Sequence, residues 1–287
     1  MKKFLFPLMI LSAFFIVACG PDEPTTPEET EEEKAARLKM ESVPEESFNL
    51  FYKSSGSKCP PCGGWGWTLM EAAISQLHDE AAPIVGYSQN FVAYDFINSA
   101  ATEYDGINGI DKKGWPSFIM NDERLEPAGQ TIDQVVSDAM MQARNTYALH
   151  EDDGVLANGV FNWKVENNRV SGNVRVRFFK ETSGTYLASV WFDESGMMAP
   201  QSGHPDGVVA HHHALRQISS ESVMGDEIAK GDIAKDAVYE LSFSDIEFPE
   251  GAWDVNNTEA TLVIYKKVGT TYKFINASKT EVDFTVE

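Results

Sequence analysis

The sequence predicts an α/β domain over residues 47–150, followed by an all-β sandwich domain over residues 151–287. In the first segment, apolar residues at helical spacing alternate with short aromatic and β-branched runs that are typical of strands. From about Val155 onward the apolar period changes to two, and turn residues separate the runs. A hydrophobic content of 43% and an aromatic content of 11% are sufficient for ordinary cores in both domains.

Residues 1–18 have the features of a signal peptide. Lys2 and Lys3 form a positive start, and the stretch from Phe4 to Val17 is almost entirely apolar. A membrane-spanning helix needs about 20 apolar residues, whereas this stretch is shorter and contains Pro7. We therefore expect export and removal of this segment. An ordinary secretory signal with a cysteine at its cleavage site is the alternative.

The run Ile16-Val17-Ala18-Cys19 resembles the lipobox of bacterial lipoproteins. The resemblance implies that the thiol of Cys19 receives a diacylglycerol lipid, that the chain is cut before this residue, and that the lipid anchors the protein to a membrane. Gly20 follows the cysteine, which resembles the class of lipoproteins destined for the outer membrane. An acidic run close behind the cysteine resembles a signal for surface display, so the periplasmic face and the cell surface both remain open.

Residues 19–46 are predicted to form a disordered acidic tether. They are rich in Pro, Thr and Glu, include the run Glu31-Glu32-Glu33, and contain almost no apolar side chains. Repulsion between like charges extends such a segment, and prolines stiffen it. The formal net charge of the whole chain is −21, which argues against nucleic acid as a partner.

The chain has three cysteines, so the assignment of Cys19 to lipid leaves Cys59 and Cys62 as an isolated pair. A C-x-x-C motif in an exported protein can be a redox site, a structural disulfide or half of a zinc site. Zinc would need two further ligands, and the run His211-His212-His213 lies in the other predicted domain. The acidic loops near Asp105 and Glu151 lack the alternating pattern of a calcium site. We expect no metal and no cofactor.

The elements of the first domain follow one another in a regular order. The predicted order is a strand at 48–53, the cysteine pair, a helix with apolar residues at 69, 70, 73, 74 and 77, a strand at 84–88, a helix or loop through 104, a strand at 117–120, and a final helix. The sequence Thr131-Ile132-Asp133-Gln134 is a capping box that opens the final helix.

This order, with the cysteine pair at the first strand-to-helix junction, resembles the thioredoxin fold. The resemblance implies that Pro116 is cis, lies beside the disulfide and has neighbouring backbone that pairs with substrate. A cysteine at a helix N-terminus has a stabilised thiolate, so Cys59 is expected to attack and Cys62 to resolve. Lys58 and Trp115 would lie next to substrate. Both depart from the residues that are common in thioredoxins, and Trp115 is bulky enough to obstruct substrate approach.

The glycines after the cysteine pair weaken the case for a helix that begins there. Gly63, Gly64 and Gly66 are poor helix formers, while Thr68-Leu69-Met70-Glu71 is itself a capping box. The stable helix is therefore predicted to begin at Thr68. In that case Cys59 would lose much of the stabilisation that a helix N-terminus gives to a thiolate.

The second domain is predicted to be an immunoglobulin-like sandwich of about seven short strands. Turns are expected at Asn167-Asn168, Ser183-Gly184 and Val268-Gly269, and a long loop, of the kind that often carries binding functions, is expected from Asp193 to Ala210. The predicted strands are 170–178, 186–192, 239–243, 261–265, 272–275 and 282–286. The aromatic residues Trp163, Trp191 and Phe192 are assigned to the core rather than to a ligand platform.

Over the whole mature chain, the arrangement resembles the outer membrane lipoprotein family named for a 28-kilodalton outer membrane protein. The matching features are the lipobox, the C-x-x-C motif, Trp115-Pro116, and a C-terminal β-domain that contains His213-Ala214-Leu215-Arg216. Two functions from different classes follow. The first is an anchored thiol–disulfide oxidoreductase that acts on the thiols or disulfides of exported proteins. The second is a non-enzymatic lipoprotein in which the disulfide is structural and the β-domain binds a surface ligand.

Overall fold

The computed structural model describes residue 30 and residues 43–77, 80–88, 98–127, 129–247 and 253–281. The predicted signal peptide, Cys19, most of the predicted tether and the predicted strand at 282–286 lie outside these residues. Within this part of the chain, no helix is both long enough and apolar enough to cross a membrane.

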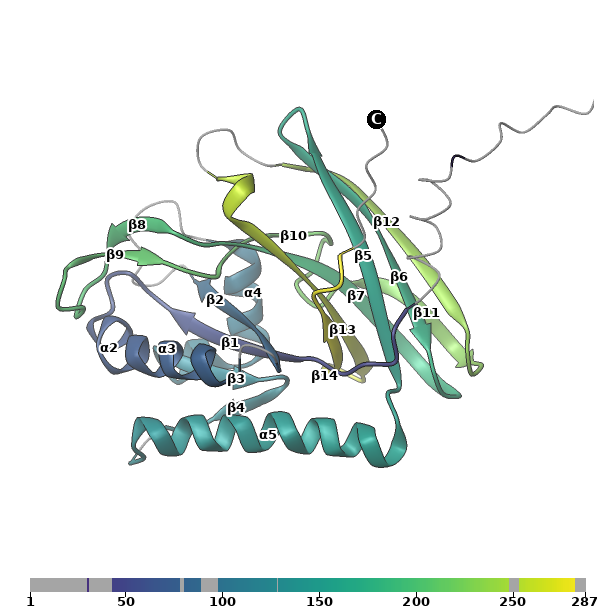
Figure 1. Cartoon of the computed structure of the whole chain (residues 1–287), viewed down its shortest axis with the longest axis horizontal. Helices are drawn as coiled ribbons and strands as arrows, with labels where there is room; N and C mark the ends of the chain where they lie inside the picture. The colour runs from purple at the N-terminus through teal and green to yellow at the C-terminus, as the bar shows by residue number, and fades with distance from the viewer. Residues whose placement is uncertain are drawn as a thin grey trace, which may run out of the picture.

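The described chain is mostly β-sheet, with a few helices in its first half (Figure 1). The first half contains β1 (Asn49–Ser55), α2 (Pro60–Gly63), α3 (Trp65–Leu77), β2 (Ala81–Tyr87), α4 (Ser99–Ile107), η1 (Ile110–Lys112), β3 (Ser117–Met120), β4 (Glu123–Leu125) and α5 (Ile132–Asp153). The second half contains β5 (Ala157–Glu166), β6 (Arg169–Phe178), β7 (Thr182–Glu194), β8 (Met197–Pro200), β9 (Val208–His211), β10 (Ala214–Ile218), β11 (Asp226–Ile233), β12 (Val238–Glu247), η2 (Val255–Asn257), β13 (Thr258–Val268) and β14 (Thr271–Ser278).

One mixed sheet runs through both halves. Its strand order over the described residues is β14-β13-β7-β10-β2-β1-β3-β4, and β11 also pairs with β7. The seam between the halves is the parallel pairing of β10 with β2, where Ala214 lies opposite Val85. The backbone N–H of Val85 donates to the carbonyl of His213 at 2.6 Å. The sheet is therefore continuous across position 150/151, where the sequence suggests a domain boundary.

Both faces of this sheet are covered. In the first half, α3 and α5 pack on one face and α4 on the other, and α5 lies along the lower edge of the molecule in Figure 1. In the second half, the sheet β12-β6-β5 packs face to face against β7, β11 and β13. Trp191 and Phe192 are fully buried in β7, and the partly buried Trp163 packs against Phe192 with ring centroids 5.4 Å apart. The core assignment of these three aromatic residues is confirmed.

Local signals located most elements of the first half correctly. The strands predicted at 48–53, 84–88 and 117–120 correspond to β1, β2 and β3. The capping box at α5 is also present, because the Thr131 hydroxyl accepts from the Gln134 backbone N–H at 3.3 Å and the Gln134 side chain accepts from the Thr131 N–H at 2.8 Å.

The predicted helix start at Thr68 is wrong, because α3 begins at Trp65 and follows α2 almost directly. The glycines that suggested a later start serve packing instead. A Cβ atom on Gly66 would lie 2.5 Å from Cγ of Pro116, so only glycine lets this turn of the helix approach the proline. Close tertiary packing thus outweighs the low helix propensity of glycine here.

Two predictions in the second half are also corrected. Ser183 and Gly184 lie inside β7 rather than in a turn, and the segment 193–210 contains β8 and most of β9, which form a hairpin, rather than one long loop. Glycine and serine are signals for turns, but β7 is paired over this stretch with β11, and that pairing holds it extended. Asn167 and Asn168 do form a turn, with φ angles of 51° and 60°.

Asn276 connects the segment just before β1 to the β half. Its side chain is fully buried in β14. Its amide oxygen accepts from Phe48 N–H at 2.8 Å, and its NH₂ group donates to the carbonyls of Glu46 at 2.8 Å and Ala157 at 3.0 Å. One side chain therefore holds the approach to β1, the start of β5 and β14 together.

Replacing Asn276 by alanine is expected to lower the free energy of unfolding by about 3 kcal/mol or more, because it leaves several buried backbone groups without partners. Urea denaturation followed by circular dichroism measures this loss. The matched control is Asn256→Ala at an exposed site, where a change below about 0.5 kcal/mol is expected. Equal effects of the two substitutions would contradict the role assigned to Asn276.

Candidate redox site

Cys59 and Cys62 form a disulfide just after β1, with their Cα atoms 5.3 Å apart. Cys59 is the N-cap residue of α2, and Cys62 lies one helical turn further on. Cys59 keeps 6% of its surface exposed, whereas Cys62 is fully buried. Of the two cysteines, Cys59 is the one that keeps any exposed surface.

The two prolines of the motif remove backbone donors from the first turn of α2. Pro60 and Pro61 have no N–H group, and the N–H groups of Cys62 and Gly63 both donate to the carbonyl oxygen of Cys59, at 3.1 and 3.3 Å. The Cys59 side chain accepts no capping hydrogen bond. A Cys59 thiolate would therefore depend on nearby positive charge more than on backbone donors.

A buried lysine lies beneath the disulfide. Lys53 projects from β1, is 2% exposed, and donates from Nζ to the carbonyl of Cys62 at 3.3 Å. The same ammonium lies 5.5 Å from the centroid of the Trp67 ring. Burial lowers the pKa of Lys53 to about 7, although the negative charge of Glu71 opposes this. Sequence reasoning missed this residue. The signal was a lysine within the aromatic run Phe51-Tyr52-Lys53 of a buried strand.

Trp115 and Pro116 lie on the other side of the cysteine pair. The peptide bond between them is cis, as the resemblance implied. The carbonyl oxygen of Trp115 lies 3.8 Å from Sγ of Cys59. The Trp115 indole N–H donates to Oδ2 of Asp105 at 3.3 Å, which directs the ring towards α4. The contact between Trp115 and the disulfide is therefore made by its backbone.

Asp105 is the centre of a buried hydrogen-bond network behind this site. Its carboxylate also accepts from the hydroxyl groups of Ser54 and Tyr52, the latter at 3.1 Å. Burial raises the pKa of Asp105, while these donors oppose the rise. The carboxylate is thus engaged in the interior.

A loop from the second half covers α2. It connects β8 to β9 over residues 201–207, and its Ser202 N–H donates to the carbonyl of Ser57 at 2.8 Å. The buried side chain of Gln201 donates to the carbonyls of Gly56 at 3.2 Å and Cys59 at 3.4 Å. A Cβ atom on Gly63 would lie 2.2 Å from the carbonyl oxygen of Ser202. No local sequence pattern predicts this contact, because its two partners lie far apart in the chain.

An open pocket is lined in part by Pro116. Its volume is about 720 Å³, and its apolar wall is formed by Trp65, Leu69, Pro116, Ile132 and Val135. Trp65 is 40% exposed there. The pocket is large enough for one or two apolar side chains of another polypeptide.

The predicted histidine run is divided between two environments. His211 is fully buried, and its Nδ1 lies 2.7 Å from the Tyr87 hydroxyl. Burial lowers the pKa of His211 to about 4. His213, in contrast, contacts Asp193 through Nδ1 at 3.1 Å. Among the described residues, no histidine or carboxylate joins the two cysteines in a group that could hold a metal.

No protein-family model matches the sequence, and no curated protein matches it. A solved structure, HBP35 of Porphyromonas gingivalis, matches with a TM-score of 0.61 and 15% sequence identity, over 86% of this chain and 80% of that chain. The chain is similar in fold to HBP35. A match of this extent must include parts of both halves.

A domain of the outer membrane lipoprotein Omp28 from Porphyromonas gingivalis gives a TM-score of 0.27 and 13% identity, over 45% of this chain and 89% of that chain. The structure places Cys59, Cys62 and the Trp115-Pro116 backbone close together, and Lys58, next to Cys59 in the chain, is exposed.

Proposed function

We propose that this chain is an exported, lipid-anchored protein that exchanges thiols and disulfides through Cys59 and Cys62. In this proposal the α/β half is thioredoxin-like, and the β half is an immunoglobulin-like sandwich. The observation that carries it is the position of the disulfide. Cys59 caps a helix after the first strand, keeps a small exposed surface, and faces the backbone beside Pro116.

The exchange proceeds in two balanced steps. In the reduced protein, the Cys59 thiolate attacks one sulfur of a substrate disulfide, and the other substrate sulfur leaves as a thiolate. The Cys62 thiolate then attacks Sγ of Cys59 in the mixed disulfide and releases the second substrate sulfur. The substrate gains two electrons, and the Cys59–Cys62 disulfide forms again. The same steps in reverse oxidise a substrate dithiol.

The proposed substrates are other exported proteins. A lipid on Cys19 would hold the site close to the outer membrane, at its periplasmic face or at the cell surface, and the acidic tether would limit its reach. The pocket beside Pro116 offers room for apolar residues that flank a substrate cysteine, and the exposed Lys58 would meet acidic ones. In this proposal the chain is also related to the Omp28 family of lipoproteins.

The reduced Cys62→Ser variant is expected to accumulate a mixed disulfide with a disulfide-linked test peptide, because the resolving sulfur is absent. Non-reducing electrophoresis and mass spectrometry measure the adduct. The matched variant Cys59→Ser should form no adduct, since its remaining sulfur is buried, and its rate of peptide reduction should fall by about 100-fold or more.

A second function is favoured by the loop that covers α2. If the contacts of Gln201 and Ser202 keep Cys59 closed, the disulfide is structural and the protein is a non-enzymatic lipoprotein that binds a surface ligand through its β half. The same experiment separates the two functions. A wild-type disulfide that resists glutathione, with no adduct in either serine variant, supports the structural role and overturns the enzyme.

A further inference from the structure

Two carboxylates face each other across neighbouring strands at one end of the β half. Asp193 in β7 is the direct register partner of Glu259 in β13. Like charges directly opposite each other destabilise a strand pair. Lys279 offsets part of this repulsion, because its Nζ lies 2.6 Å from Oε2 of Glu259. Its ion pair is with Glu259, however, and not with Asp193.

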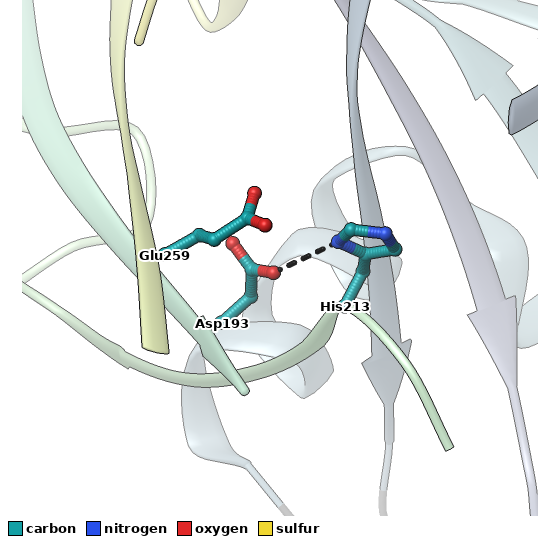
Figure 2. A group of neighbouring side chains, drawn as sticks. All are labelled: Asp193, His213 and Glu259. Carbon is teal, nitrogen blue, oxygen red and sulfur yellow. Dashed lines mark hydrogen bonds and ion pairs between the residues drawn. The ribbon is translucent and has the colours of Figure 1, made fainter. Parts of the chain in front are cut away.

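A histidine completes the group. His213 lies between β9 and β10, and its Nδ1 lies 3.1 Å from Oδ2 of Asp193. Its backbone N–H donates to Oγ of Ser195 at 3.0 Å, which fixes the turn. One ligand atom from each of Asp193, His213 and Glu259 lies within 4.8 Å of the other two. Figure 2 shows the three side chains gathered together.

The second oxygen of Asp193 has no partner among the described residues. Asp193 is 1% exposed, and its Oδ1 is buried without a hydrogen bond. Figure 2 shows this oxygen directed towards the Glu259 side chain rather than towards His213. A buried carboxylate oxygen without a partner is costly. Among the described residues, no hydrogen-bond donor therefore meets this oxygen.

We propose that Asp193, His213 and Glu259 bind one divalent transition-metal ion of the Zn²⁺ or Mn²⁺ type. Imidazole and carboxylate ligands suit these ions. The ion would replace the proton that Nδ1 of His213 shares with Asp193. Two ligand atoms 3.1 Å apart, each about 2.1 Å from one ion, subtend an angle close to a right angle. Glu259 lies on the exposed side, where water can fill the remaining positions.

The bound ion would link three segments at the seam of the sheet. It would join β7 and β13 to the turn before β10. In that turn, the carbonyl of His213 accepts a hydrogen bond from the Val85 N–H of β2. The site does not involve the cysteine pair, so the proposed metal binding can be tested independently of the proposed redox function.

Isothermal titration of the full oxidised chain with ZnCl₂, and separately with MnCl₂, tests the proposal. The absence of reductant keeps the cysteines from binding metal. For at least one of the two ions, we expect one site per chain with a Kd in the micromolar range or below. Binding should weaken at least tenfold in Glu259→Gln and be lost in His213→Gln and Asp193→Asn. The control His212→Gln changes the neighbouring histidine and should leave the Kd unchanged.

Failure to bind either ion below about 1 mM overturns the proposal, as does undiminished binding by both Glu259→Gln and His213→Gln. Loss of binding in His212→Gln alone would assign the ion to the histidine run instead, and would overturn it too. If Asp193→Asn does not fold, the other two substitutions still decide the matter, because both change side chains that are not fully buried.

Discussion

Replacing Lys53 by methionine is expected to raise the free energy of unfolding by about 3 kcal/mol at pH 6. The native protein holds this lysine in the interior, where its pKa is lowered to about 7, whereas the unfolded chain has the ordinary value of 10.5. At pH 6 both states carry the proton, and the native state bears the full cost of a buried charge. Methionine has a similar length and carries no charge.

The advantage of the methionine variant should shrink as the pH rises. Between pH 7 and 10.5 the unfolded wild type binds more protons than the native protein, so wild-type stability increases with pH by up to about 1.4 kcal/mol per unit. Lys53→Met lacks this contribution. Urea denaturation of the oxidised proteins at pH 6, 7, 8 and 9 measures the difference.

The exposed Lys58→Met is the control, and its stability should differ from the wild type by less than about 0.5 kcal/mol at every pH. If Lys53→Met and the wild type show the same dependence on pH, the Lys53 ammonium is not buried as described. In the reduced protein, the same ammonium beside Cys62 would stabilise a thiolate, so Lys53→Met should also raise the pKa of the thiols.

Replacing Gly203 by alanine is expected to detach the loop that covers the cysteine pair. Gly203 has a φ angle of 84°, and a Cβ atom there would lie 2.0 Å from the carbonyl oxygen of Pro60. The three nearest atoms all belong to the backbone of Pro60, so the loop must move away from α2. We expect a loss of about 3 kcal/mol in the free energy of unfolding and reduction of the disulfide by dithiothreitol about tenfold faster.

Gly207 provides a matched control in the same loop. Its φ angle is 72°, but a Cβ atom there would meet nothing within 4 Å. Gly207→Ala therefore introduces the backbone strain without the clash. The expected loss in the free energy of unfolding is about 1 kcal/mol. Denaturation curves and thiol labelling during reduction measure both effects. Similar results for the two alanine variants would show that the loop does not cover Cys59 through Gly203.

Sequence patterns predicted the elements of the α/β half well, because their signals are local. A capping box, a proline before a strand, and apolar residues at helical spacing each report on a few neighbouring residues. Strand β7 shows where such signals fail. Ser183-Gly184 has the composition of a turn, yet pairing with Gly231 and Asp232 of β11 keeps this stretch extended.

The surroundings of the candidate site could not be predicted in the same way. The cysteine pair and Pro116 were found from a motif and its order in the chain. The loop at 201–207, the depth of Lys53 and the register that places Asp193 opposite Glu259 all depend on long-range pairing. A single sequence contains no local signal for contacts of this kind.

The hydrogen bonds of the Asn276 side chain determine how a pulling force applied before residue 46 would be transmitted to the fold. Any pull on the chain before residue 46 reaches Glu46 and Phe48, which are tied through Asn276 to β14 and the start of β5. Part of the force is thereby transmitted to β14, an edge strand of the main sheet, before it reaches β1. The strand that leads into Cys59 would be shielded from tension, so a pull on the chain before residue 46 would leave the geometry of the cysteine pair undisturbed.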